Sequence, residues 1–169
     1  MEKVVYRGLR ASDLDTAVAF VNELVAEDTY LAVDRKYSRR EEKKWLNSTL
    51  KAIKAQNEAR VVAEVDGKMV GACHVARRAD FNRARHSGTF GISVLKKWRG
   101  KGIGTELARR TIAKAKKIGI RLMLLSYFEN NPFAPGFYRN MGFRECGKWP
   151  KAILFRGKYV DEIMMYKQL

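Results

Sequence analysis

The stretch that decides the fold is Arg99-Gly100-Lys101-Gly102-Ile103-Gly104-Thr105. It lies between a strand-like segment, residues 86–94, and a helix-like segment, residues 105–117. A glycine-rich turn between a strand and a helix exposes backbone N–H groups that have no acceptor inside the helix. Together with the positive end of the helix dipole, these groups form a site for anions, most often phosphate. The turn therefore predicts a ligand that carries phosphate.

Length and composition set the class of protein. A chain of 169 residues, 46% of them hydrophobic, is typical of one globular domain, here residues 1–169. No apolar run approaches the roughly 20 residues of a membrane helix, and the sequence from Met1 lacks the pattern of a secretory signal. Cys73 and Cys146 fit no metal-binding spacing and favour buried free thiols in a reducing compartment over a disulfide. We expect a cytoplasmic protein with no membrane segment and no metal.

The chain is strongly basic, with a formal net charge of +16. Such an excess attracts anions, so nucleic acid, the ribosome and acidic cofactors are all candidate partners. The basic residues are spread along the chain instead of forming one block. A solvated basic surface and a dedicated anion-binding patch both remain open.

The order of the expected elements indicates an α+β fold, or an α/β-type fold with a mixed sheet. The strands are expected at residues 4–10, 59–65, 69–77, 87–94, 121–128, 143–147 and 159–167. Asp66-Gly67-Lys68 is a tight-turn signal that predicts a hairpin of the second and third strands, and a loop through Trp149 and Pro150 joins the last two. The helices are expected after Ser12 or Asp13, after a capping box at Ser38, and at residues 105–117 and 132–141. This alternation predicts a mixed, mostly antiparallel sheet flanked by helices.

Three kinds of glycine-rich turn compete for the central stretch. A mononucleotide P-loop needs G-x-x-x-x-G-K-[ST], and the chain has no such run. A dinucleotide fingerprint needs G-x-G-x-x-G with an acidic residue about 20 positions later. Thr105 and Leu124 occupy those two places, so this fingerprint is broken. The third kind is Arg99-x-x-Gly102-x-Gly104, which resembles the R/Q-x-x-G-x-G/A motif of the GNAT superfamily of N-acetyltransferases.

A second motif strengthens the resemblance. Asn131-x-x-Ala134-x-x-Phe137-Tyr138-x-x-x-Gly142-Phe143 is similar to the N-x-x-A-x-x-L-Y-x-x-x-G-F segment of the same superfamily, and residues 157–165 resemble its closing strand. The resemblance spans nearly the whole chain. It implies the GNAT acyl-CoA N-acyltransferase fold, acetyl-CoA as cosubstrate, and direct attack by a primary amine in a ternary complex.

The resemblance also assigns residues to the cofactor. Backbone groups of a splayed strand, Ile92, Ser93 and Val94, would bind the pantetheine amides, and side-chain packing of Ile92 and Val94 does not compete with this role. The phosphates would bind the turn residues Gly100, Lys101, Gly102, Ile103, Gly104 and Thr105. Arg99 has two possible roles, a direct phosphate contact or a plain surface charge. Asn131 is open between a contact to the pantetheine arm and a helix cap before Pro132.

Tyr138 is the predicted catalytic residue. When an amine attacks a thioester, negative charge builds on the carbonyl oxygen and then on the departing sulfur. A phenol beside the sulfur can donate a proton or a hydrogen bond, and backbone N–H groups can stabilise the oxyanion. The resemblance implies that Tyr138 is the general acid, whereas the alternative is a buried core tyrosine.

The general base is undetermined. Relatives that acetylate the N-termini of ribosomal proteins carry a glutamate five residues before the motif asparagine, and this chain has Ser126 there. Deprotonating a lysine near pKa ~10.4 costs about 4–5 kcal/mol at neutral pH, but an α-amino group near pKa ~8 costs roughly 1 kcal/mol. A water held by Ser126, or Glu129, Glu64 or His86, could accept the proton, and an α-amino group could react with water alone.

The acceptor amine is also open. Residues 87–94 and the C-terminal segment resemble amino-acid and phosphinothricin acetyltransferases, which favours a small molecule or an amino acid. The alternatives are a protein N-terminus, including that of a ribosomal protein, and a non-catalytic CoA-binding module associated with ribosome or RNA. Nucleic-acid binding without CoA is disfavoured because no RNA-reading aromatic motif is present. Relatives also suggest a possible homodimer. The expected acceptor residues, in loops 25–37 and 149–158, are Asp28, Tyr30, Asp34, Tyr37, Trp149 and Tyr159.

Overall fold

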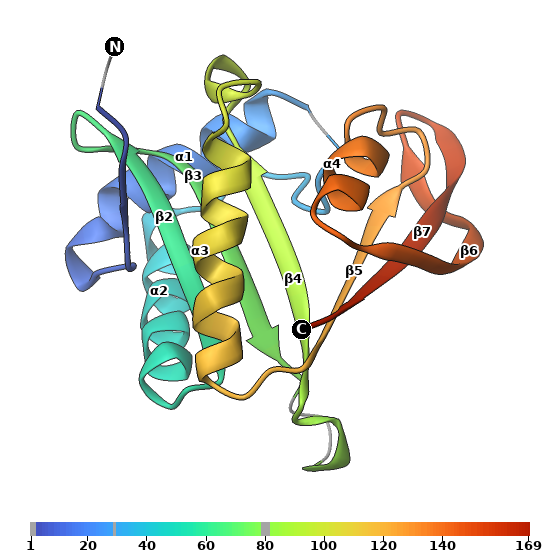
Figure 1. Ribbon diagram of the computed structural model, residues 1–169. Coiled ribbons are helices and arrows are strands. Elements are labelled where there is room, and N and C mark those ends of the chain that lie inside the picture. Colours follow the sequence, from blue (N-terminus) through green and yellow to red (C-terminus); the bar gives the residue numbers. More distant parts are fainter. Residues whose placement is uncertain (1–2, 29, 79–81) are drawn as a thin grey trace.

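The computed structural model describes residues 3–28, 30–78 and 82–169. Its centre is a seven-stranded sheet in the order β1-β2-β3-β4-β5-β7-β6 (Figure 1). The strands are β1 (Val5–Arg7), β2 (Glu58–Val65), β3 (Lys68–Arg77), β4 (Ser87–Val94), β5 (Leu122–Phe128), β6 (Arg144–Phe155) and β7 (Lys158–Gln168). The helices are α1 (Leu14–Ala26), α2 (Arg39–Lys54), α3 (Ile103–Lys117) and α4 (Ala134–Asn140). The expected α+β order of elements is confirmed.

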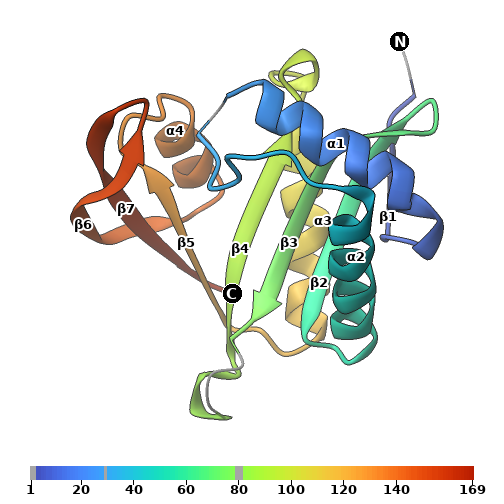
Figure 2. The ribbon, with the colours of Figure 1, turned by 180° about the vertical axis from the view of Figure 1, so that it is seen from behind.

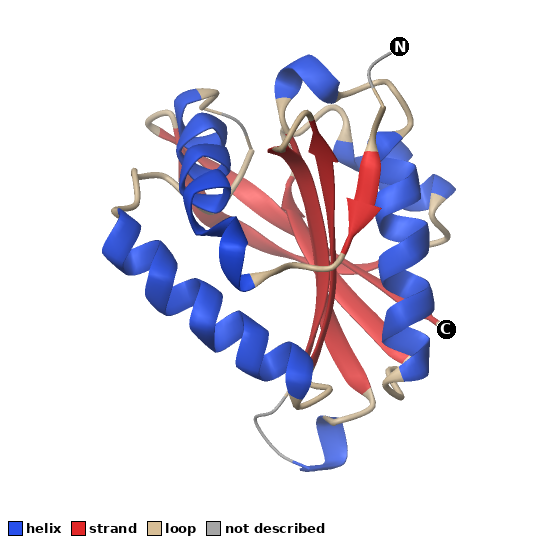
Figure 3. Ribbon diagram, turned by 90° about the vertical axis from the view of Figure 1, so that its left-hand side faces the viewer, coloured by secondary structure: helices blue, strands red, loops and turns tan. Residues whose placement is uncertain are grey.

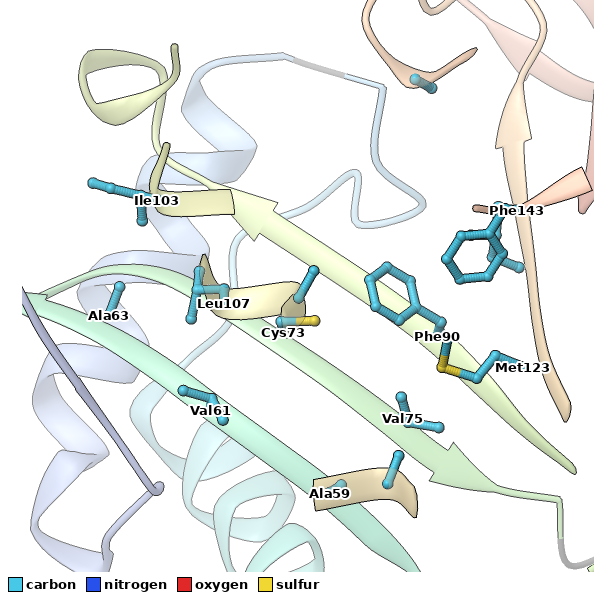
Figure 4. Close-up of a cluster of buried hydrophobic side chains, with 14 of the residues drawn as sticks. Ala59, Val61, Ala63, Cys73, Val75, Phe90, Ile103, Leu107, Met123 and Phe143 are labelled. Carbon is cyan, nitrogen blue, oxygen red and sulfur yellow. The ribbon is translucent and has the colours of Figure 1, made fainter. Parts of the chain in front are cut away.

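Helices cover both faces of the sheet because its central strands are apolar on both faces. On β2, Val61 packs in the cluster that contains Leu107 of α3, and its neighbour Val62 packs in the cluster that contains Leu24 of α1. Figures 2 and 3 show α1 and α2 on the face opposite α3. Figure 4 shows the cluster under α3, into which Phe90 of β4 also projects. β4 is thus held in the centre of the molecule by its own core side chains.

Strand pairing is antiparallel except between β4 and β5. The turn Asp66-Gly67 joins β2 to β3, and the capping box of Ser38 and Glu41 opens α2, both as expected. No helix within the described ranges is long and apolar enough to cross a bilayer.

Three local expectations were wrong. The predicted loop through Trp149 and Pro150 belongs to β6, which runs on to Phe155. Proline is tolerated there because β6 is an edge strand with an irregular register between Trp149 and Ile153. The last helix, α4, begins at Ala134, two residues later than expected. Cys146 is an exposed thiol, and only Cys73 is buried.

Candidate functional site

The central feature of the site is the separation of β4 from β5. These parallel strands pair only through Ser87–Leu122, Gly88–Met123 and Thr89–Leu124. Beyond that point β4 stays paired with β3 as far as Val94, whereas β5 continues beside β7. Figure 1 shows the two strands diverging toward their C-terminal ends. The edge of β4 from Phe90 onward is therefore free of a strand partner within the described chain, and an extended ligand can pair with it.

A cleft of about 860 Å³ lies on the α1–α2 side of the sheet and extends to the diverging strands, since its lining includes Phe20 of α1, Trp45 of α2 and Ile92 of β4. Its lining includes the predicted residues Ile92, Ser93, Val94, Arg99, Asn131 and Tyr138. The turn residues 100–105 lie outside this lining and directly after it, where α3 begins. The structure thus brings the predicted pantetheine residues together with Tyr138 and places the predicted phosphate turn next to them.

The geometry of the turn depends on two glycines. Gly100 has φ 71° and Gly102, the N-cap of α3, has φ 77°, both in the left-handed region that favours glycine. The first hydrogen bond of the helix runs from the Glu106 N–H to the Gly102 carbonyl (3.1 Å). Helix geometry therefore leaves the N–H groups at the start of α3 without intrahelical acceptors. The Nζ of Lys101 lies 4.8 Å from the ring centroid of Trp98 and adds positive charge to this end of the helix.

Arg99 has protein partners on both sides. Its Nε donates to the Val94 carbonyl (2.7 Å), and its Nη2 donates to the Glu27 carboxylate (2.5 Å). Glu27 also accepts a hydrogen bond from the Lys96 N–H (2.6 Å). Arg99 thus connects the end of β4 to the end of α1. A phosphate contact would have to share this guanidinium with Glu27.

Asn131 has a structural role other than the helix cap that the sequence suggested. Its Oδ1 accepts a hydrogen bond from the Phe133 N–H (3.1 Å), which fixes the turn before α4. The residue at the N-cap of α4 is Phe133, so Asn131 is not the helix cap. Asn131 also lines the cleft, and its Nδ2 has no hydrogen-bond partner among the residues described. The oxygen has a structural role, and the amide nitrogen is available to a ligand.

Tyr138 is at once part of the core and part of the cleft. Its ring contacts Phe90, Tyr127, Phe137 and Phe143, with centroids 5.4–6.2 Å apart. Its hydroxyl has no hydrogen-bond partner in the described part of the chain, and the residue lines the cleft. Burial, with smaller contributions from Cys73 and Tyr127, raises the pKa of Tyr138 to about 12. The phenol is therefore protonated at neutral pH and can donate a hydrogen bond to a ligand.

Among the base candidates, only Ser126 lines the cleft. Glu64 pairs with Arg7 near the β1 edge of the sheet, and His86 lies just before β4, at the end remote from the turn. Neither Glu64, His86 nor Glu129 contributes to the cleft lining. These three expectations are not supported by the geometry.

Glu162 on β7 is a site residue that the sequence analysis missed. It lines the cleft, and its Oε1 accepts a hydrogen bond from the Ser126 hydroxyl (2.5 Å). Strand pairing explains the contact, because Glu162 lies opposite Phe128 and therefore shares a face with Ser126 two residues away. No local pattern could have signalled this pairing, since 36 residues separate the two side chains.

One wall of the cleft comes from the α1–α2 loop, the first of the two loops predicted to hold the acceptor, whereas residues 149–158 of the second loop are not part of its lining. The Phe155 ring, near the tip of the β6–β7 hairpin, packs against Tyr30 (5.2 Å between centroids) and Phe128 (5.7 Å). Arg156 pairs with Asp28 (3.0 Å), so the hairpin and the α1–α2 loop meet. Of the six predicted acceptor residues, only Tyr30 and Tyr37 line the cleft. Asp28, Asp34, Trp149 and Tyr159 do not.

Comparison with known proteins agrees with this geometry. Residues 18–143 match the model of the Acetyltransferase (GNAT) family. An uncharacterized N-acetyltransferase of Methanocaldococcus jannaschii is 34% identical over 119 residues, which cover 69% of this chain and 52% of that protein. The L-amino acid N-acetyltransferase AaaT of Escherichia coli is 32% identical over 108 residues, 62% of this chain and 65% of that protein. The chain thus matches between half and two thirds of the length of these relatives.

The fold of nearly the full chain superimposes on solved acetyltransferase structures. A GNAT-family acetyltransferase from Streptococcus pneumoniae superimposes with a TM-score of 0.89 at 25% identity, covering 99% of this chain and 100% of that one. A phosphinothricin acetyltransferase from Sinorhizobium meliloti, solved with acetyl-CoA, has a TM-score of 0.84 at 21% identity and covers 98% of this chain and 88% of that one. The family match covers most of the sequence and the shared fold covers nearly all of it, so the chain belongs to the GNAT family of acetyltransferases.

Proposed function

We propose that this protein transfers the acetyl group of acetyl-CoA to the primary amine of an amino acid or a similar small molecule. The observation that carries the proposal is the unpaired edge of β4, which borders a cleft that Tyr138 also lines. Donor and acceptor would both occupy this cleft, so that the amine attacks the thioester directly.

The residues of the site fit acetyl-CoA. The β4 edge at residues 92–94 offers backbone groups for the amides of the pantetheine arm, with Asn131 Nδ2 across the cleft. The start of α3, with its glycines of positive φ, suits the pyrophosphate. When bound, the cosubstrate supplies an activated acetyl group.

The acid and base roles follow from the groups around the cleft. Backbone N–H groups of β4 would stabilise negative charge on the acetyl oxygen, and Tyr138 would donate a hydrogen bond to the leaving sulfur. With a pKa of about 12, Tyr138 is a weaker acid than a thiol near pKa ~8.5, so hydrogen-bond donation is its main contribution. Glu162, directly or through the Ser126 hydroxyl, would accept the proton of the attacking amine.

A small acceptor is supported by contacts between loops beside the cleft. The contacts of Arg156 with Asp28 and of Phe155 with Tyr30 join the hairpin to the α1–α2 loop beside the cleft, which leaves less room for a peptide chain. The names of the Escherichia coli and Sinorhizobium meliloti proteins, an L-amino acid and a phosphinothricin acetyltransferase, support the same class of acceptor.

The test is a thiol-release assay with acetyl-CoA over amino acids, polyamines, aminoglycosides and peptides with free N-termini. We expect release with free amino acids, at a higher kcat/KM than with peptides that begin with the same residue. Release with peptides alone would assign the protein to the acetylation of protein N-termini. A thermal shift with CoA but no release from any amine would instead indicate a non-catalytic CoA-binding module.

A further inference from the structure

Arg60 of β2 is a buried cation on the wall of the cleft. Only 9% of its side-chain surface is exposed, and its Nε donates to the equally buried Glu58 carboxylate (2.6 Å). The Trp45 ring covers one face of the guanidinium, 5.1 Å from ring centroid to Cζ. Arg60 and Trp45 both line the cleft. The ion pair and the ring fix the orientation of the guanidinium plane.

The two terminal nitrogens of Arg60 are open to the cleft. Neither has a hydrogen-bond acceptor among the described residues. Across that same part of the chain, the Nε of Arg77 is the one buried side-chain nitrogen or oxygen that lacks a partner. The terminal nitrogens of Arg60 are therefore not sealed in protein, and the space that they reach is the cleft. A free guanidinium edge of this kind matches the two oxygens of a carboxylate.

The other guanidinium groups of the cleft are already paired. Arg35 pairs with Glu41 (2.9 Å) and is largely exposed. Arg99 pairs with Glu27 and with a backbone carbonyl. Arg60 is thus the arginine of the lining that combines deep burial with free donors.

An uncharged side chain separates Arg60 from the reacting strand. His74 of β3 lies opposite Arg60 in the register, and Gly91 of β4 lies opposite His74. The imidazole lies over Gly91, where a side chain would collide with it. Two strand spacings, about 10 Å in all, separate Arg60 from β4 along this row. An arginine side chain and a small amino acid together can span that distance.

We propose that Arg60 binds the carboxylate of the acceptor through its two terminal nitrogens. The amine of the same molecule would then point toward the free edge of β4, near Tyr138 and the Ser126–Glu162 pair. This inference rests on the proposed acetylation of small amines and narrows the acceptor to amino acids with a free carboxylate.

The first test compares an amino acid with its own α-amide, which keeps the side chain and the amine but lacks the anionic oxygens. The quantity measured is the ratio of kcat/KM for the acid to that for the amide, in the wild type and in variants. The acid and the amide differ in the basicity of their amines, but the same two compounds are used with every variant. This difference therefore cancels when the ratios of wild type and variants are compared. We expect Arg60→Met to lower the ratio about 10- to 100-fold, mainly through KM for the acid.

Two further variants make the test specific. Arg60→Lys keeps the charge but not the planar fork, and we expect a ratio between those of the wild type and Arg60→Met. Lys44→Met removes a cation that lines the same cleft from the exposed face of α2, and we expect an unchanged ratio. A similar fall in both methionine variants would indicate a diffuse charge effect and would overturn the proposal.

A control for folding is needed because Arg60→Met leaves Glu58 buried without its partner. The double variant Glu58→Gln/Arg60→Met removes both charges. Its thermal unfolding and CoA affinity should be closer to those of the wild type than those of Arg60→Met are. If this variant folds, binds CoA and keeps the full preference for the acid, the inference is wrong.

Binding measured without turnover separates this inference from the proposed function. Calorimetric titration of the amino acid into CoA-saturated protein should give weaker binding to Arg60→Met than to the wild type. If no amine gives thiol release but Arg60 still governs amino-acid binding, the proposed reaction fails and the carboxylate site stands. If release occurs without any preference for the acid, the carboxylate site fails and the reaction stands.

Discussion

At the scale of single residues, Tyr138 lines the cleft while four aromatic rings hold its own ring in place. Tyr138→Phe keeps the aromatic contacts with Phe90 and Phe143 and removes only the donor. We expect kcat to fall by about 10²–10⁴-fold with unchanged affinity for CoA, measured by steady-state kinetics and calorimetry. Tyr127→Phe is the matched control, because that hydroxyl is bonded to Glu145, and it should change kcat far less. An unaltered kcat in Tyr138→Phe would exclude the phenol from the reaction.

Glu162 gives a second prediction at this scale. Without a carboxylate to accept the proton, Glu162→Gln can react only with the fraction of the acceptor that is already neutral. We therefore expect kcat/KM of the variant to rise about tenfold per pH unit below the pKa of the amine. The wild type should show a shallower rise. Asp161→Asn alters the neighbouring carboxylate, which is held by Lys148, and should retain the wild-type profile. Identical pH profiles for wild type and Glu162→Gln would rule out Glu162 as the base.

At the scale of elements, the turn before α3 separates ligand binding from stability. Gly102 has φ 77° and Gly119, at the other end of the same helix, has φ 84°. Valine at either position forces a side chain into the left-handed region and should destabilise the protein by about 1–3 kcal/mol in thermal or urea unfolding. Only Gly102→Val should also abolish CoA binding in calorimetry. Equal CoA affinities for the two variants would show that the turn does not hold the phosphates.

The sequence predicted those elements that have local signals. The capping box at Ser38, the turn at Asp66-Gly67 and the glycine turn each carry their own local chemistry, and each appears where expected. The extension of β6 was missed because a proline in an edge strand has the same local signature as a loop. Glu162 and Arg60 were missed because their positions depend on strand register, which fixes partners across long sequence separations.

At the scale of the whole molecule, the half-buried His74 makes stability depend on pH. Burial, and to a smaller extent the charge of Arg60, lowers the pKa of His74 to about 3, compared with about 6.5 in the unfolded chain. Between pH 6.5 and 3, the His74 imidazole is protonated in the unfolded state but stays neutral in the folded state. The free energy of unfolding should therefore fall by about 1.4 kcal/mol per pH unit from pH 6.5 toward pH 3.

Urea unfolding at several pH values tests this dependence. His74→Gln should flatten the slope between pH 6.5 and 5, where carboxylates with lowered pKa values, such as Glu106, stay ionised in the folded state and contribute equally in wild type and variant. The raised pKa of Glu42 acts in the opposite direction, but it is present in every variant and cancels in the comparison. The exposed His86 is the control, since His86→Gln should keep the wild-type slope. If the unfolding free energy of His74→Gln falls with pH as steeply as that of the wild type, groups other than His74 cause the loss of stability in acid.

The divergence of β4 and β5 also has a consequence for the order in which reactants bind and products leave. Side chains from both faces of the sheet line the opening, with Phe90 from the α3 layer and Val62 from the α1 layer. In the proposed reaction, both reactants would occupy this one cleft at the same time, so neither would have to leave before the other arrives. Double-reciprocal plots for the two reactants should accordingly intersect instead of running parallel, and each product should be able to leave first.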